Sequence, residues 1–287
     1  ILKEELQTIA DKYGDERKTD IEDVMDEIDI EDLIEEESCV FTLTDGGYIK
    51  RVSADTYRTQ KRGGKGITAM ATKEEDFVDT VFTASTHDYI MFFTNKGKVH
   101  RKKGYQIPEA GRTAKGTAMV NVLPLEPEEK VTAMIHLENR EPTETDRYLM
   151  LITRRGTVKR VALSALFTAR KAGIRCITLD EGDELISAQE TDGTAAVLLC
   201  TRRGMTICFR EDDVRCMGRD AYGVRGINLR EGDYVVGAAC ARYDHQVLMV
   251  TENGYGKRTP MDDYFRGDGP QKRGGYGMKG YNVTDKT

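Results

Sequence analysis

The residues best suited to binding chemistry form one short stretch, Gln60-Lys61-Arg62-Gly63-Gly64-Lys65-Gly66. Glycine adopts positive φ values and lets the backbone approach a ligand closely. A turn this rich in glycine can direct bare N–H groups at an anion, while Lys and Arg side chains supply positive charge. These residue types in this spacing predict a loop that binds phosphate groups.

The elements around this loop repeat along the chain. Five segments share an apolar strand, the pattern Thr-x-x-Gly and a second strand that is usually basic, and they cover residues 41–51, 92–101, 151–160, 199–208 and 249–258. A three-residue turn that ends in glycine is typical of a β-hairpin. The sequence therefore predicts five hairpins in an internal repeat.

Each predicted hairpin is followed by a loop that is basic or contains glycine, and then by further strands. The loops are residues 60–66, 111–116, 170–173, 218–226 and 271–280, and strands are predicted after them at 119–122, 177–179, 227–229 and 281–283. A fourth strand follows in the middle repeats, for example at 131–135 and 234–239. Four short strands in a repeat of about 50 residues are typical of propeller blades.

We therefore expect an all-β, propeller-like array of about five to six four-stranded blades over residues 39–287, preceded by a short α-helix and an acidic linker. The first hairpin has no strand pair before it, and the strand at 281–283 has no hairpin after it. Either these two halves close a five-bladed ring or the last blade lies beyond Thr287, and we expect the second arrangement.

The first 40 residues differ in composition from the rest. Leu2, Leu6, Ile9 and Tyr13 are spaced as one face of a helix, which Gly14 would end. Residues 1–40 hold 16 acidic and 4 basic residues, a balance of −12, so the other 33 acidic and 39 basic residues give the body a balance of +6. We expect the end of a longer helix at 1–14 and a solvated acidic linker at 15–38.

Composition also argues against several classes of protein. No apolar run is long enough to span a bilayer, and the N-terminus lacks a signal-peptide pattern. The six cysteines never form Cys-x-x-Cys, which favours small buried side chains in a reducing cytosol, and the four histidines lack ligand spacing. No carboxylate pair or histidine cluster recurs as a propeller active site would require. We expect a cytoplasmic protein with no metal site.

Within this repeat array, the heptapeptide at 60–66 resembles the box found in the C-terminal domain of DNA gyrase A subunits, with Lys61 where Arg is commoner. The run Gly14-Asp15-Glu16-Arg17-Lys18 is similar to the one that ends the coiled-coil helix of that family. The resemblance covers nearly the whole chain. It implies the β-pinwheel fold of a bacterial type IIA topoisomerase.

The resemblance also implies a function. In that family the domain wraps duplex DNA so that the holoenzyme introduces negative supercoils in an ATP-dependent way, and the box is needed for supercoiling. The DNA-cleaving Tyr lies in the family's N-terminal portion, so this chain would hold no catalytic residue and no cofactor, while ATP and Mg²⁺ would bind at other domains. The implied partners are duplex DNA and, in an A2B2 complex near the bacterial nucleoid, a second A subunit with the gyrase B subunit. No membrane partner is implied.

Basic residues recur at equivalent places in the repeats, and in a propeller one repeat position lies at one radius. Recurring charge then forms a stripe that matches a bent polyanion, whose affinity should fall steeply with salt. The alternative is ordinary solvated Lys and Arg. The predicted DNA-binding rim comprises Lys50, Arg51, Lys98, Arg101, Lys102, Arg112, Lys115, Arg154, Arg155, Lys159, Arg160, Arg170, Lys171, Arg202, Arg203, Arg225, Lys257, Arg258, Lys272 and Arg273.

Two other interpretations remain open. One is the C-terminal domain of a topoisomerase IV A subunit, whose box is degenerate, and the nearly intact heptapeptide argues against it. The other is a propeller that binds protein partners, which would show a salt-insensitive affinity and no DNA binding. Separately, the acidic linker could compete with DNA for the basic surface.

Overall fold

The computed structural model of the 287-residue chain describes residues 2–15, 30–57, 70, 76–138, 147–167, 172–284 and 286. The chain divides into two units, residues 1–35 and residues 36–287. The predicted heptapeptide loop at 60–66 lies outside the described residues, as do Arg170, Lys171 and most of the predicted acidic linker.

The first unit contains the predicted N-terminal helix, α1 (Leu2–Tyr13), and a single 3-10 turn, η1 (Ile30–Leu33). The apolar stripe of α1 is solvent-exposed, and no residue of the helix is buried. The N–H of Gly14 donates to the carbonyl of Ala10 at 2.8 Å and closes the last turn. No helix in the described part of the chain is long and apolar enough to cross a membrane.

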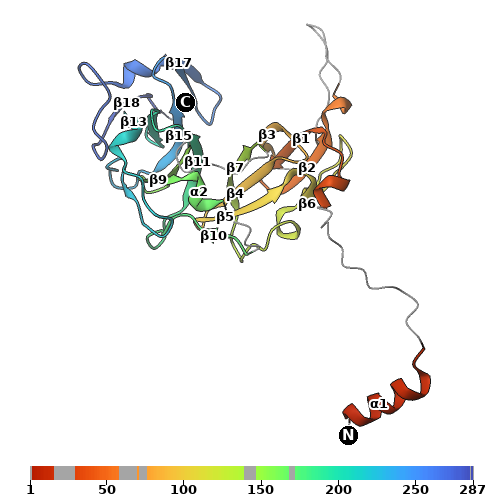
Figure 1. The fold of residues 1–287 in the computed structure, drawn as a ribbon. Coiled ribbons are helices and arrows are strands. Elements are labelled where there is room, and N and C mark those ends of the chain that lie inside the picture. Colours follow the sequence, from red (N-terminus) through yellow and green to blue (C-terminus); the bar gives the residue numbers. More distant parts are fainter. Residues whose placement is uncertain are drawn as a thin grey trace. The chain divides into compact units, whose positions relative to one another are not determined.

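The described residues of the second unit form five antiparallel sheets, each built around one hairpin (Figure 1), and all five predicted hairpins are present. They are β1 (Ser38–Thr44) with β2 (Tyr48–Ser53), β4 (Tyr89–Thr94) with β5 (Lys98–Lys103), β8 (Tyr148–Thr153) with β9 (Thr157–Ala162), β12 (Ala196–Thr201) with β13 (Met205–Arg210), and β16 (Gln246–Val250) with β17 (Gly256–Pro260).

The Thr-x-x-Gly pattern forms each hairpin turn through local hydrogen bonds. In the first hairpin the N–H of Gly47 donates to the carbonyl of Thr44 at 2.9 Å, and the N–H of Tyr48 donates to the Thr44 hydroxyl at 3.1 Å. The glycine of every turn has a φ between +70° and +82°, a region that glycine adopts without strain. The same two bonds recur in the other four turns.

The first strand of four hairpins also pairs with a longer strand from later in the same repeat. These strands are β3 (Val78–Ser85), β7 (Val131–Leu137), β11 (Leu185–Thr191) and β15 (Val235–Ala241). Strand β11 contacts both β7 and β15, so the long strands of neighbouring sheets lie side by side. A short helical turn follows the second strand of every hairpin: η2 (Ala54–Thr56), η3 (Gly104–Gln106), α2 (Leu163–Leu166), η5 (Glu211–Asp213) and η6 (Met261–Tyr264).

The fourth strand of each complete sheet is donated by the next repeat, which the sequence did not predict. These strands are only two residues long: β6 (Thr117–Ala118) pairs with β2, β10 (Ile174–Arg175) with β5, β14 (Val224–Arg225) with β9, and β18 (Met278–Lys279) with β13. In the described residues the β16–β17 sheet has two strands. Each complete sheet is therefore joined to the next repeat by the strand that this repeat donates.

The strands predicted at 119–122, 177–179, 227–229 and 281–283 are wrong, because each donated strand lies just before the predicted range. Each donated strand pairs with the second strand of the preceding hairpin. That strand begins at the hairpin turn, so the pairing cannot continue past the turn. At that point the N–H of Met119 donates to the carbonyl of Gly47 at 2.9 Å, and the chain continues into η4 (Met119–Asn121). The equivalent bond recurs in the next three repeats, from Cys176, Gly226 and Gly280 to the preceding turn glycine.

The core lies between adjacent sheets. Along β4, Met91 and Phe93 pack into a cluster with Leu149 and Leu151 of β8, whereas Ile90 and Phe92 pack on the opposite side with residues of the first sheet, including Phe41. Successive strand residues point to opposite faces, so a strand between two sheets buries both faces and becomes continuously apolar. Each such buried side chain contributes about 1.5–3 kcal/mol.

Replacing Phe93 by Ala should lower the free energy of unfolding by about 3–5 kcal/mol, because a cavity opens between two sheets. Val120, which is 65% exposed, provides the control, and Val120→Ala should change stability by less than about 0.5 kcal/mol. Denaturant unfolding measures both. Similar losses for the two variants would contradict this packing of the core.

Candidate nucleic-acid interface

The loop that precedes each donated strand ends in a glycine with positive φ. These glycines are Gly116, Gly173, Gly223 and Gly277, with φ values of +85°, +73°, +105° and +71°. A Cβ on Gly116 would lie 2.5 Å from the carbonyl oxygen of Ile49 in the neighbouring sheet. The glycine therefore lets the loop lie directly against the second strand of the preceding hairpin, which we call the outer strand.

A buried lysine lies beneath two of these loops. The Lys50 ammonium donates to the carbonyls of Gly111, Arg112 and Ala114 at 3.3, 2.5 and 2.9 Å. The Lys159 ammonium donates to the carbonyls of Cys176, Arg219 and Ala221 at 2.8, 2.5 and 3.1 Å. Both residues are fully buried. Burial lowers the pKa of Lys50, and it lowers the pKa of Lys159 to about 8.

Lys50 and Lys159 thus lie inside the blades and not on the rim, where the repeat pattern predicted them. Their ammonium groups are occupied by loop carbonyls, so they position the loops instead of facing a ligand. The available signal in the sequence was that side chains alternate along a strand. Lys50 and Arg51 are consecutive, so one of them must point to the opposite face from the other. The sequence does not say which of the two is inside.

Other residues occupy this position in the second and fourth hairpins. His100 is buried beneath Gly173, whose Cβ would lie 2.6 Å from the imidazole Cε1, and burial lowers the pKa of His100. Ile207 lies beneath Gly275, with 3.8 Å between its Cδ1 and a Cβ built on that glycine. The position is therefore filled by a buried side chain in four hairpins, and by a cation in two of them.

The cations at the hairpin turns contact acidic residues of the same repeat. The Arg154 guanidinium lies 3.6 Å from the Glu184 carboxylate. The backbone N–H of Arg155 donates to the Asp183 carboxylate at 2.9 Å, while its guanidinium donates to the carbonyl of Glu181 at 2.7 Å. In the second hairpin Lys98 donates to Glu126 at 2.5 Å, and this bond lowers the pKa of the Glu126 carboxyl. These carboxylates reduce the positive field at the turns.

The same acidic environment recurs in the fourth hairpin. The backbone N–H of Arg203 donates to the Asp233 carboxylate at 3.2 Å, and the Thr201 hydroxyl donates to the same carboxylate at 2.7 Å. Arg154 and Arg202 both lie over the ring of Tyr234, at 4.1 and 5.7 Å from its centroid. The signal for these contacts was present in the sequence but missed: it is the recurrence of Glu-Gly-Asp at 181–183 and 231–233.

Arginines on the outer strands are half-buried. Arg51 contacts Glu37 at 3.2 Å and Glu109 at 3.4 Å, while Arg101 and Arg160 lie over aromatic rings. Lys102 is half-buried as well. The structure thus places these predicted rim residues on the outer strands, with part of their charge already engaged.

The remaining predicted rim residues belong to the loops, to the donated strands or to the last hairpin. Arg112 and Lys115 are half-buried in the loop of the second repeat, with Lys115 at 3.9 Å from the ring centroid of Tyr48. The exposed members are Arg225, Lys257, Arg258 and Lys272, while Arg273 is half-buried. Two cations outside the predicted rim, Arg175 and Lys279, lie exposed on donated strands. Exposed positive charge is therefore present on the donated strands, at Lys272 in the fifth-repeat loop and on the last hairpin, and also at the turns, where Arg154, Arg155, Arg202 and Arg203 are exposed.

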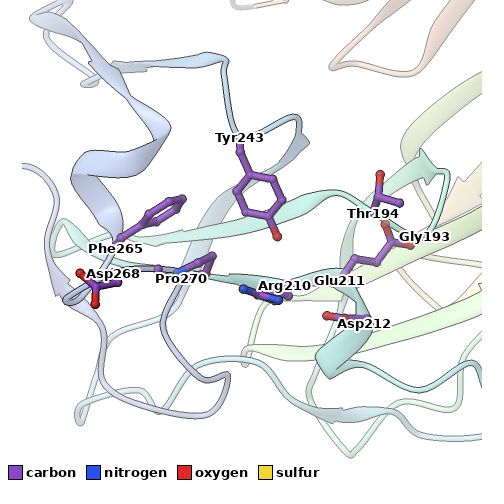
Figure 2. A pocket seen from close by; sticks show the side chains of 10 residues that line it. Gly193, Thr194, Arg210, Glu211, Asp212, Tyr243, Phe265, Asp268 and Pro270 are labelled. Carbon is purple, nitrogen blue, oxygen red and sulfur yellow. The ribbon is translucent and has the colours of Figure 1, made fainter.

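A pocket of about 460 Å³ adjoins the loop of the fifth repeat. Figure 2 shows Tyr243, Phe265 and Arg210 around it, and the carboxylates of Glu211, Asp212 and Asp268 also line it. Burial raises the pKa of the Tyr243 hydroxyl. Three carboxylates against one guanidinium repel phosphate, so this pocket is no part of a nucleic-acid track. The described residues hold no group of three His, Cys, Asp or Glu side chains arranged for a metal ion.

Comparisons with known proteins agree with this architecture. The family described as DNA gyrase C-terminal domain, beta-propeller, matches residues 40–85, 88–137, 147–192, 195–242 and 245–286, one range for each repeat. The DNA gyrase A subunit of Clostridium acetobutylicum is 49% identical over 287 residues, which are 100% of this chain and 34% of that protein. The chain therefore spans about a third of the length of this relative.

Two solved structures have the same fold. The C-terminal domain of DNA topoisomerase IV matches with a TM-score of 0.70 and 26% identity, covering 86% of this chain and 73% of that one. The DNA gyrase A C-terminal domain matches with a TM-score of 0.68 and 30% identity, covering 87% and 80%.

Replacing Gly116 by Ala should destabilise the chain more than replacing Gly47 by Ala. Both have positive φ, which costs a non-glycine residue about 1–2 kcal/mol, but only Gly116 faces a carbonyl at 2.5 Å, since nothing lies within 4 Å of a Cβ on Gly47. We expect at least twice the loss of unfolding free energy in denaturant titrations. Equal losses would show that the loop does not need this close approach.

Replacing Lys159 by Met should change how stability depends on pH. The folded pKa of about 8 lies below the ordinary value of 10.5, so the unfolded chain binds more protons between these values and the free energy of unfolding rises with pH. The Met variant should lack this component of the rise. Denaturant titrations between about pH 8 and pH 10 under reducing conditions measure it. Parallel curves for the two proteins would contradict the lowered pKa of Lys159.

Proposed function

The chain belongs to the DNA gyrase C-terminal β-propeller family. From this premise we propose that it wraps duplex DNA around the outer loops of its blades, by which we mean the loop at 60–66 and the loops that precede the donated strands. One observation carries the proposal. Glycines with positive φ hold these loops against the second strands of the preceding hairpins, and buried lysines lie under two of them. The exposed cations Lys272, Arg175, Arg225 and Lys279 lie on the fifth-repeat loop and on the donated strands.

The geometry suits phosphate contacts that are independent of base sequence. The carbonyls of two loops point inward onto Lys50 and Lys159, which removes acceptors that would repel phosphate. The described residues contain no helix placed to read base edges, so binding should follow the backbone and the deformability of DNA. Bending a site of 20–30 bp by 40–90° costs on the order of 1–6 kcal/mol, which several phosphate contacts must offset.

For the complete protein we propose the role of a gyrase A subunit. It would pair with B subunits and with a second A subunit in the bacterial cytoplasm, and ATP-driven strand passage in other domains would convert the wrap into negative supercoils. The residues at 60–66 would act as the principal clasp on DNA. DNA cleavage and ATP hydrolysis would not occur in this chain alone.

A topoisomerase IV domain is the second candidate, because its solved C-terminal domain has a similar fold at 26% identity. The sequence relative at 49% identity is a gyrase subunit, which favours gyrase. The nearly intact heptapeptide points the same way.

Replacing Lys61, Arg62 and Lys65 together by Ala should reduce wrapping more than it reduces binding. The control removes three cations from the turns by replacing Lys96, Arg154 and Arg155 with Ala, since these side chains already contact acidic groups or carbonyls of their own repeats. Nicked plasmid is closed with ligase in the presence of each protein, and the topoisomer distribution reports the constrained DNA.

We expect the linking-number shift to be nearly lost in the first variant and largely kept in the control. An unchanged topoisomer distribution in the first variant would refute the assignment of the clasp. An equal loss in both variants would mean that total charge, and not the outer loops, determines wrapping.

A further inference from the structure

The loop of the fifth repeat has nearly the sequence of the first. Gln271-Lys272-Arg273-Gly274-Gly275-Tyr276-Gly277 matches residues 60–66 at six of seven positions, and differs only by Tyr276 in place of Lys65. This loop lies within the described residues, so its contacts are known. The repeat pattern marked it as one of five loops and placed Lys272 and Arg273 on the predicted rim.

The backbone of this loop is fixed on the fourth sheet. The backbone N–H of Gln271 donates to the carbonyl of Cys208 at 2.8 Å, and its side-chain amide donates to the carbonyl of Tyr264 at 3.0 Å. The N–H of Gly274 donates to Gly226 at 2.6 Å. A Cβ on Gly277 would meet the carbonyl oxygen of Thr206, so only glycine fits there. The loop is therefore held without the buried lysine that lies under two other loops.

The two cations of the loop have different environments. The Arg273 guanidinium donates to the carbonyls of Asp213 and Arg225 at 2.9 and 3.0 Å, so it ties the loop to the preceding blade. The Lys272 side chain is 88% exposed, and its ammonium lies 3.1 Å from the Asp213 carboxylate. A surface ion pair of this kind contributes about 0–1 kcal/mol, which a phosphate can readily replace.

Both basic and acidic groups lie near the loop. Arg225 and Lys279 are exposed on the adjacent donated strands, and Arg266 donates to the carbonyl of Gly277 at 3.0 Å. Asp213 is the carboxylate paired with the loop, while Asp212 and Asp268 line the pocket beside it. Arg225, Lys279 and Arg266 therefore add positive charge near the loop, and Asp213 is the carboxylate that Lys272 contacts.

We propose that residues 271–277 form a second clasp for the phosphate backbone of duplex DNA, in which Lys272 leaves the Asp213 carboxylate for a phosphate while Arg273 holds the loop in place. Asp213 then acts as a competitor that sets the strength of this clasp. The inference rests on the proposed function, and it adds a second fixed point on the wrapped DNA in the fifth repeat.

Three substitutions test the clasp in the 287-residue chain. Lys272→Gln removes the contacting charge. Asp213→Asn removes the competing charge but keeps the backbone carbonyl that binds Arg273. Tyr276→Lys restores the residue type found at position 65. Lys96→Gln is the matched control, because Lys96 is also a surface lysine with a carboxylate neighbour, Glu126 at 3.8 Å.

The measurement is the affinity for linear duplex DNA over a series of salt concentrations, with thermal unfolding to show that each variant is folded. Lys272→Gln should weaken binding by about fivefold to tenfold near 0.1 M salt and reduce the slope of log K against log salt by about one. Tyr276→Lys should produce changes of similar size in the opposite direction. Asp213→Asn should tighten binding in the parent chain but not in the Lys272→Gln background.

Unchanged affinity and slope for both Lys272→Gln and Tyr276→Lys would overturn the second clasp, as would equal effects of Lys272→Gln and Lys96→Gln. If the variant lacking Lys61, Arg62 and Lys65 still loses wrapping in that case, the proposed function stands and only this inference fails. Absence of salt-sensitive DNA binding by the parent chain would overturn both.

Discussion

The contact between a buried lysine and the loop of the next repeat is the interaction that fixes two of the outer loops. A charged group inside a protein loses several kcal/mol of solvation, and it is tolerated only when its hydrogen bonds are made. Lys50 and Lys159 each reach three backbone carbonyls, and most of these belong to the following repeat. The buried ammonium group of one repeat therefore has its hydrogen-bond acceptors only when the next repeat is packed against it, which couples the folding of adjacent repeats.

The donated strands strengthen the same coupling between repeats. A two-residue strand contributes few hydrogen bonds, and its position depends on the glycine before it and on the turn glycine of the preceding hairpin. Each outer loop is thus attached to two sheets at once. Under the proposed function, loops anchored in this way would keep their cations at fixed positions against bent DNA, whereas loops attached to a single hairpin would move more easily.

Charge is sorted between two edges of the blades. At the hairpin turns, acidic residues that follow in the same repeat contact the cations, as Glu126 contacts Lys98 and Glu184 contacts Arg154. In the fifth-repeat loop, Arg273 donates to backbone carbonyls and the exposed Lys272 has one carboxylate partner, Asp213. This separation reconciles a net charge of −6 with a surface suited to a polyanion, because the acidic residues are concentrated in the first 40 residues and at the turns.

The sequence by itself determined the features that arise from neighbouring residues. The five hairpins could be predicted because Thr-x-x-Gly forms its own hydrogen bonds, as Thr44 and Gly47 do, and the all-β class followed from their repetition. The tertiary structure alone decided which of Lys50 and Arg51 is buried, because alternation fixes opposite faces but not which face meets the next loop. It also decided that Thr117 and Ala118 pair with β2 of the preceding repeat, since a two-residue strand has no periodicity and its partner is about 70 residues away. Local hydrogen bonding is written in the sequence, whereas the burial of a charge and the choice of a distant strand partner depend on how the blades pack.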